Sequence, residues 1–105
     1  KALTEMLILY LLSQREYYIG ELTAALSEKS HRILNIVFPY AAIYRLLDDG
    51  FIQELKKRIA PDGRRRQYYT ITPAGREYLQ ELLSTYRRFT YGVANVMSEE
   101  SQQEE

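Results

Sequence analysis

One stretch of this chain, residues 51–72, constrains the fold more than any other. Its sequence, FIQELKKRIAPDGRRRQYYTIT, places β-branched and aromatic residues on both sides of a central Ala60-Pro61-Asp62-Gly63 segment. Proline presets φ in a turn, an aspartate side chain can bond nearby backbone amides, and glycine can adopt a positive φ. The stretch is therefore predicted to be two short strands joined by a tight turn.

The predicted hairpin is strongly basic around this turn. Six cations and one acid fall within 11 residues, and the cations are Lys56, Lys57, Arg58, Arg64, Arg65 and Arg66. Charges on an edge strand often serve only to discourage sheet pairing between molecules. The alternative is contact with nucleic-acid phosphates. The elements that flank the hairpin favour the second interpretation.

Two helices are predicted at the start of the chain. Residues 2–13 carry apolar residues at the i, i+3, i+4 spacing of a helix. This stripe comprises Leu3, Met6, Leu7, Tyr10 and Leu11, and it is broadened by Ile8, Leu9 and Leu12. The first helix is therefore expected to be covered on more than one side. After a polar break at residues 14–16, a second helix is predicted from about Tyr18 to Ser30, with Leu22 and Leu26 facing inward.

A third helix is predicted just before the hairpin. The preceding segment, SHRILNIV, could be a short β segment or a buried linker, and Asn35 is a plausible N-cap. The helix should start between Ile36 and Pro39 and end near Asp49, with Gly50 as the C′ residue. Its core-facing residues are Ala42, Ile43, Leu46 and Leu47, and its opposite side carries Tyr40, Ala41, Tyr44 and Arg45.

Helix, helix, short link, helix and basic hairpin is the order of a winged helix-turn-helix. The predicted fold class is mainly α with a small β-hairpin, and residues 1–72 form the DNA-binding domain. In this fold the third helix enters the major groove, and the hairpin lies on the backbone or in the minor groove. The candidate DNA-binding residues are Tyr40, Tyr44, Arg45, Lys57, Arg64, Arg65 and Arg66. Tyr40 and Tyr44 could instead pack against other helices, and His31 and Arg32 are further candidates for a phosphate contact.

A fourth helix, residues 73–97, is predicted to follow, with Thr72 as N-cap and Pro73 at its first position. Apolar residues recur along it at spacings of three and four: Leu79, Leu82, Tyr86, Phe89, Val93 and Val96. This is the seam of a coiled coil. A small domain cannot cover both the seam and the other face of this helix, so the pattern predicts a homodimer. The alternative is a helix that lies flat on its own domain.

Composition narrows the classes of function. The chain of 105 residues has one histidine and no cysteine, so disulfides and thiolate metal sites are impossible. It has no Gly-rich phosphate loop and no spaced set of metal ligands. We therefore expect no enzyme, no catalytic or metal-binding residues and no cofactor. Without an apolar run near about 18 residues or a secretory signal, a cytoplasmic protein with no membrane partner is expected.

The net charge of zero conceals an uneven distribution. Four acids lie in residues 98–105, SEESQQEE, which we expect to be a disordered acidic tail. The remainder carries 14 basic and 10 acidic residues. The neutral total, and a third helix whose only cation is Arg45, favour one rival function. This rival is a winged-helix protein-interaction module without DNA binding.

Four passages of the chain resemble the PadR family of bacterial transcription regulators in its short form. The first is the leucine-rich opening helix with Tyr18 and Glu21-Leu22, and the second is Tyr40 with Arg45-Leu46 and residues 49–52, DGFI. The third and most specific is residues 63–69, GRRRQYY, with Ile71-Thr72 and Gly75, and the fourth is the helix after it. The sequence departs from the family at residues 35–39, NIVFP, where the family usually has Ser-Pro-(Gly/Ala)-Thr-Leu, and at Gly20, where an aromatic is common.

The resemblance implies a homodimeric repressor that presents its two third helices to a palindromic operator. Some members of the family sense planar aromatic compounds or phenolic acids between the subunits. Tyr86 and Phe89 occupy the corresponding places on the seam, with Tyr10 and Met6 as possible neighbours from the first helix. Tyr86 and Phe89 are therefore candidate ligand residues, although aromatic residues at this spacing are more often part of a core.

Overall fold

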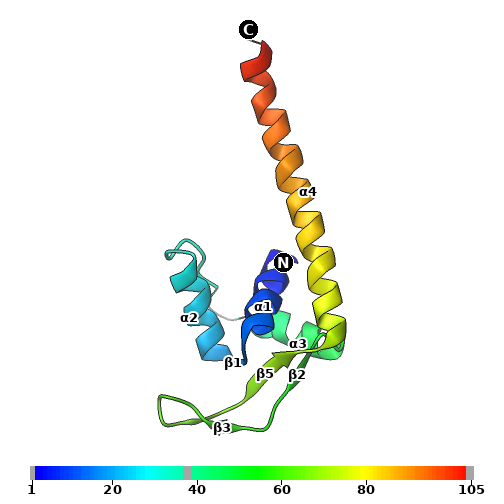
Figure 1. Cartoon of the computed structure of the whole chain (residues 1–105). Coiled ribbons are helices and arrows are strands. Elements are labelled where there is room, and N and C mark those ends of the chain that lie inside the picture. The colour runs from blue at the N-terminus through cyan, green and yellow to red at the C-terminus, as the bar shows by residue number, and fades with distance from the viewer. Residues whose placement is uncertain (1, 37–38, 104–105) are drawn as a thin grey trace.

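The computed structural model describes residues 2–36 and 39–103, and the side chains among them up to residue 98. The elements in chain order are α1 (Ala2–Gln14), β1 (Tyr17–Tyr18), α2 (Ile19–Lys29), α3 (Tyr40–Asp48), β2 (Ile52–Glu54), β3 (Arg58–Ile59), β4 (Arg65–Arg66), β5 (Tyr68–Ile71) and α4 (Pro73–Gln103) (Figure 1). This mainly helical fold with a small antiparallel sheet confirms the predicted winged helix-turn-helix. The hairpin formed by residues 52–71 is called the wing below.

The core is built around α1, which contacts α2, α3, α4 and β5. The most deeply buried side chains of α1 are Ile8, Leu9 and Leu12. This confirms that α1 is covered on more than one side. The expected stripe was partly wrong, because Leu3 and Tyr10 are 44% and 48% exposed. Apolar residues fill nearly every position of α1, so spacing alone could not show which of them face outward.

A short strand, β1, was not predicted. It pairs with β5 in the order β1-β5-β2, with Tyr17 opposite Tyr69 and Tyr18 opposite Tyr68. The sequence analysis assigned Tyr18 to the start of α2. Two tyrosines carry little strand signal by themselves, and the pairing depends on β5, which lies about 50 residues later in the chain.

The wing has two parts rather than two continuous strands. Its root pairs β2 with β5, and its distal part pairs β3 with β4, with Arg58 opposite Arg66. At the junction, the Gln67 side-chain amide donates to the backbone carbonyls of Leu55 and Tyr68. The predicted turn is confirmed, since the Gly63 N–H donates to the Ala60 carbonyl at 2.8 Å and Gly63 has φ +84°.

The ends of α3 and the start of α4 show why these helices stop and begin where they do. The N–H groups of Gly50 and Phe51 donate to the carbonyls of Leu47 and Leu46, and Gly50 has φ +77°. This is the Schellman arrangement expected of a C′ glycine. Thr72 Oγ1 accepts from the Gly75 N–H at 3.0 Å, which confirms the predicted N-cap of α4.

The start of α3 differs from the prediction. The residue that precedes the helix is Pro39, and the side chain of Asn35 bonds to Ser27 and to the Arg32 carbonyl instead of capping the helix. Asn35 as N-cap was therefore wrong. Residues 30–36 form no strand, and Ile33 is 79% exposed, so this part of the linker is not a buried segment either. Residues 37 and 38 lie outside the described part of the chain.

The long helix α4 projects from the domain (Figure 1). Its 31 residues correspond to about 46 Å at 1.5 Å per residue. The helix extends through residues 98–103, where a disordered tail was expected, and Glu104 and Glu105 lie outside the described residues. No helix in the described ranges has the length and apolar character needed to cross a lipid bilayer.

Candidate nucleic-acid interface

The cations of the wing fall into two groups. Lys57, Arg64 and Arg65 are exposed and form no ion pair with any residue that the structure describes. Arg58 and Arg66, by contrast, are each paired with an acid. Sequence alone gave no way to separate these groups, because the partner of Arg58 comes from a distant segment.

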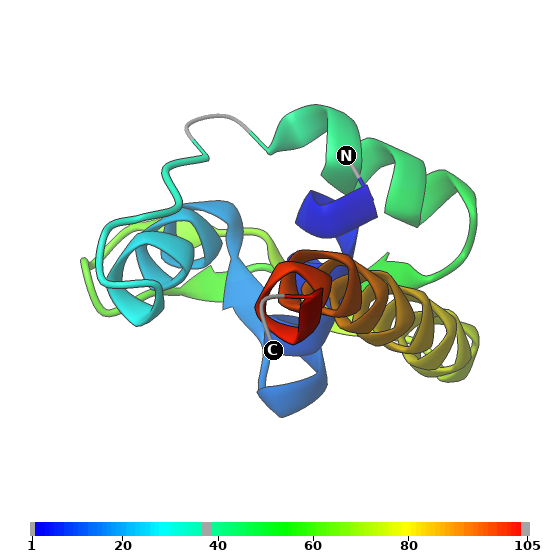
Figure 2. The same cartoon turned by 90° about the horizontal axis from the view of Figure 1, so that it is seen from above.

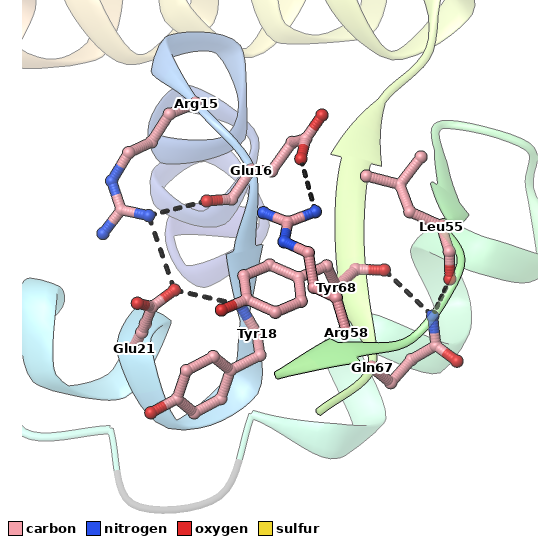
Figure 3. A network of polar contacts seen from close by, with 8 residues as sticks. All are labelled: Arg15, Glu16, Tyr18, Glu21, Leu55, Arg58, Gln67 and Tyr68. Atoms are coloured by element: carbon pink, nitrogen blue, oxygen red, sulfur yellow. Dashed lines mark hydrogen bonds and ion pairs between the residues drawn. The ribbon is translucent and has the colours of Figure 1, made fainter. Parts of the chain in front are cut away.

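Arg58 anchors the wing to the body of the domain (Figure 3). Its guanidinium lies 3.5 Å from the centre of the Tyr68 ring, and its Nη1 donates to Glu16 Oε1 at 2.8 Å. Nearby, Arg15 pairs with Glu21 at 3.4 Å, and the same Glu21 oxygen accepts from the Tyr18 N–H at the start of α2. The network joins the α1–α2 connection to the wing, so the direction of the wing is fixed by more than its strand pairing.

Arg66 is held within the wing itself. Its Nη2 donates to Asp62 Oδ2 at 2.6 Å, and its guanidinium lies 5.0 Å from the Tyr18 ring centre. The other Asp62 oxygen accepts from the Arg64 N–H at 3.0 Å. The bond from the Arg66 side chain, followed by the bond from the Arg64 backbone, lowers the pKa of Asp62 below its ordinary value of 3.8.

Acid should therefore loosen the tip of the wing. A carboxylate whose folded-state pKa is depressed stabilises the fold above its unfolded pKa, and that contribution disappears as the pH falls through the folded value. We expect Arg66 and the turn to lose this restraint as the pH falls below about 3.8, the ordinary pKa of Asp62. Proton NMR of the Arg64 amide across this range would report the change. Asp62→Asn, which keeps an acceptor for this amide, should remove the pH dependence.

The exposed side of α3 carries two of the predicted tyrosines. Tyr40, Ala41 and Tyr44, called the reading face below, are exposed, and the two tyrosine rings have centres 6.4 Å apart. The core-facing residues Ala42, Ile43 and Leu46 are buried as predicted. Arg45 is only partly exposed, because its Nε donates to Glu5 Oε2 at 2.8 Å. Sequence reasoning missed Glu5, which lies 40 residues away from Arg45.

A hollow of about 430 Å³ lies between the start of α2, the start of α3 and the root of the wing. Its lining is Tyr18, Ile19, Gly20, Thr23, Tyr40, Arg66, Gln67 and Tyr69. Two of the predicted DNA-binding residues, Tyr40 and Arg66, therefore meet at one surface. His31 and Arg32 do not contribute to this lining; they are exposed in the turn after α2, where both adopt a positive φ.

The predicted seam of α4 divides into a covered part and an exposed part. Leu79 is buried in the core of its own chain, and Leu82 packs against that core. Leu79 as a dimer contact was therefore wrong. From Tyr86 onward the seam is open, with Tyr86, Phe89, Val93 and Val96 exposed by 45%, 69%, 39% and 68%. Beyond its packed first turns, α4 does not lie flat on the domain.

A family model described as "Transcriptional regulator PadR-like family" matches residues 8–81. These residues contain α1, α2, α3, the whole wing and the start of α4. The chain belongs to the PadR-like family of transcriptional regulators. The family consists of regulators and not of enzymes, which confirms that prediction as well. No curated protein sequence matches the chain.

Solved structures of regulators resemble this PadR-like chain over most of its length. A transcriptional regulator from Clostridium thermocellum is 29% identical, with a TM-score of 0.72, and the match covers 88% of this chain and 86% of that one. A PadR-like regulator from Bacillus cereus is 28% identical, with a TM-score of 0.75 and 89% of each chain covered. Bacillus subtilis PadR, solved in complex with operator DNA, is 25% identical, with a TM-score of 0.64, over 75% of this chain and 45% of its own.

A second hollow of this PadR-like protein lies between the start of α1 and α4. It measures about 210 Å³, it is almost wholly apolar, and its lining is Ala2, Leu3, Met6, Leu82, Thr85, Tyr86 and Phe89. The structure thus brings together three of the four residues named for a ligand site, Met6, Tyr86 and Phe89. Tyr10 does not join them. No group of three metal-ligating side chains is found among the described residues.

Proposed function

We propose that this PadR-like protein is a sequence-specific repressor that binds duplex DNA as a homodimer. Residues 1–72 would bind one half of a palindromic operator, and the seam within residues 73–97 would join the two copies. The supporting observation is the position of the exposed cations Lys57, Arg64 and Arg65 on a wing that is anchored beside the reading face of α3. Such a role requires access to the chromosome, so we expect the protein in the cytoplasm.

The two surfaces would divide the work of recognition. Exposed guanidinium and ammonium groups bind phosphates without regard to sequence, whereas base edges in the major groove are recognised by hydrogen bonds and apolar contacts. On the reading face, the hydroxyls of Tyr40 and Tyr44 can exchange hydrogen bonds with bases. The methyl group of Ala41 suits contact with a thymine methyl. The hollow that Tyr40 shares with Arg66 would then face the DNA backbone between the helix and the wing.

Dimerisation would follow from the open part of the seam. Tyr86, Phe89, Val93 and Val96 expose apolar surface along one side of a helix that projects from the domain. Soluble proteins rarely leave such a stripe uncovered. A two-fold pair of identical helices is the simplest cover, and two-fold symmetry in the protein is matched by a palindromic operator.

A salt titration with two charge-matched variants tests DNA binding by the wing. Arg65→Ala should weaken binding to all duplexes and flatten the slope of log affinity against log salt by about one unit. Arg58→Ala removes the same charge, but Glu16 already neutralises this guanidinium, so the slope should change much less. Fluorescence anisotropy with a labelled random duplex measures both. Equal slopes for wild type and Arg65→Ala would exclude the wing as a phosphate-binding element.

The second candidate function is a winged-helix module that binds protein. One observation favours it: Arg45, the cation of α3, is paired with Glu5, and the exposed Asp48 adds a negative charge to the same helix. The titration separates the two functions, because wild-type protein with no affinity for random duplex at low salt would support this module. Binding that weakens steeply with salt would exclude it.

We also propose that the hollow between α1 and α4 binds a planar aromatic effector. Its lining is apolar, and Tyr86 and Phe89 could stack on a flat ring. Flat aromatic dyes should quench tyrosine fluorescence and raise the melting temperature of the wild type. Phe89→Ala should weaken both effects. An identical response of wild type and variant would place the binding site elsewhere.

A further inference from the structure

Glu5 contacts both the DNA-reading helix and the long helix. Its Oε2 accepts from Arg45 Nε on α3 at 2.8 Å, and its Oε1 accepts from the Tyr78 hydroxyl on α4 at 3.2 Å. The Glu5 side chain is only 12% exposed, so water screens these bonds little. Figure 2 shows the start of α1, which carries Glu5, between α3 and α4.

Tyr78 extends this contact to the end of α3. Its ring stacks on Phe51, with ring centres 4.3 Å apart and planes at 16°. Phe51 in turn caps α3, since its N–H donates to the Leu46 carbonyl at 2.9 Å. Burial raises the pKa of Tyr78, and the charge of Glu5 raises it further, so the hydroxyl remains a donor at neutral pH. Glu5 and Tyr78 together therefore fix α3 at two points along its length.

We propose that Glu5 is a positioning residue, which sets the orientation of α3 against α1 and α4 and thereby selects the bases that the reading face can reach. This inference rests on the proposed function. It assigns Arg45 to the interior bond with Glu5 and not to a DNA phosphate. Recognition helices must be placed accurately, because a hydrogen bond to a base edge weakens steeply with distance and angle.

Three substitutions separate this role from simple loss of structure. Glu5→Gln keeps the size of the side chain, but an amide presents one acceptor oxygen and one donor nitrogen, so it cannot accept from both Arg45 and Tyr78. Tyr78→Phe removes only the hydroxyl and keeps the ring that stacks on Phe51. Arg45→Gln removes the bond to α3. Glu77→Gln is the matched control, since Glu77 is an exposed acid on α4 that makes no ion pair with any residue in the described ranges.

The readout is the ratio of affinities for a preferred and a scrambled duplex. The preferred duplex is first selected from a random pool with the wild-type protein. Glu5→Gln should lower the ratio about tenfold and Tyr78→Phe about threefold, while affinity for the scrambled duplex stays within about twofold. Arg45→Gln should lower the ratio without changing the salt slope for the scrambled duplex. Glu77→Gln should match the wild type.

Each other result overturns a specific claim. If Tyr78→Phe and Arg45→Gln melt cooperatively and keep the wild-type ratio, Glu5 does not position α3, whether or not Glu5→Gln folds. If Arg45→Gln flattens the salt slope by about one unit, Arg45 contacts a phosphate directly and the assignment is wrong. If the wild type selects no sequence from the pool, the proposed function fails, and the inference fails with it.

Discussion

Replacing Gly75 with alanine is expected to remove about 3–5 kcal/mol of folding free energy, a large part of the stability of a domain this small. A Cβ at this position would lie 2.0 Å from the carbonyl oxygen of Phe51 and 2.8 Å from Ile71 Cγ1. The carbonyl cannot move aside freely, because it accepts the Thr72 N–H at 3.0 Å where the sheet meets α4. The methyl group must therefore push α4 away from the sheet. Chemical denaturation monitored by circular dichroism measures the loss.

Gly92→Ala provides the matched control for this substitution. Gly92 lies inside the same helix, and a Cβ there would meet nothing within 4 Å. Alanine is favoured over glycine in a helix interior by about 0.8–1 kcal/mol, so this variant should be at least as stable as the wild type. Equal stability of Gly75→Ala and Gly92→Ala would show that α4 does not approach Phe51 as closely as described here.

The features that the sequence predicted well depend on neighbours in the chain. The turn of the wing needs Pro61, Asp62 and Gly63 in consecutive order, and each acts on backbone within about two residues of itself. Likewise, Gly50 ends α3 and Thr72 begins α4 through bonds that span only a few residues. Local chemistry of this kind is the same in any fold, so the residue types alone identify it.

The missed features depend on residues that the fold brings together from distant segments. Arg58 and Arg65 look alike in the sequence, but only Arg58 meets Glu16, 42 residues away. Arg45 looked like a DNA contact, because its partner Glu5 belongs to a helix whose other residues gave no sign of a polar bond. Leu79 fits the seam by its spacing, but it is one of the first seam residues, which the domain itself buries. Position along α4 and not spacing decides which seam residues remain open.

Phe89→Glu is expected to convert the dimer into monomers and to lower affinity for the operator by a factor of about 100 or more. Phe89 is 69% exposed in a single chain, so the substitution should not disturb the fold of that chain. In a dimer it would place two carboxylates in an apolar seam, where unpaired charge is strongly unfavourable. The loss of affinity follows because linking two DNA-binding domains typically raises the overall affinity by about 10²–10⁴. Light scattering after size exclusion measures the mass, and anisotropy measures the affinity.

Tyr91→Glu separates the seam from the general exposure of α4. Tyr91 is 71% exposed, but it lies about 200° around the helix from Phe89. The same charge introduced there should leave the dimer and its DNA affinity intact. If Tyr91→Glu dissociates the dimer and Phe89→Glu does not, the partner covers the opposite face of α4. If Phe89→Glu is monomeric and binds operator as tightly as the wild type, dimerisation is not required for recognition, and the wing and reading face of one chain suffice.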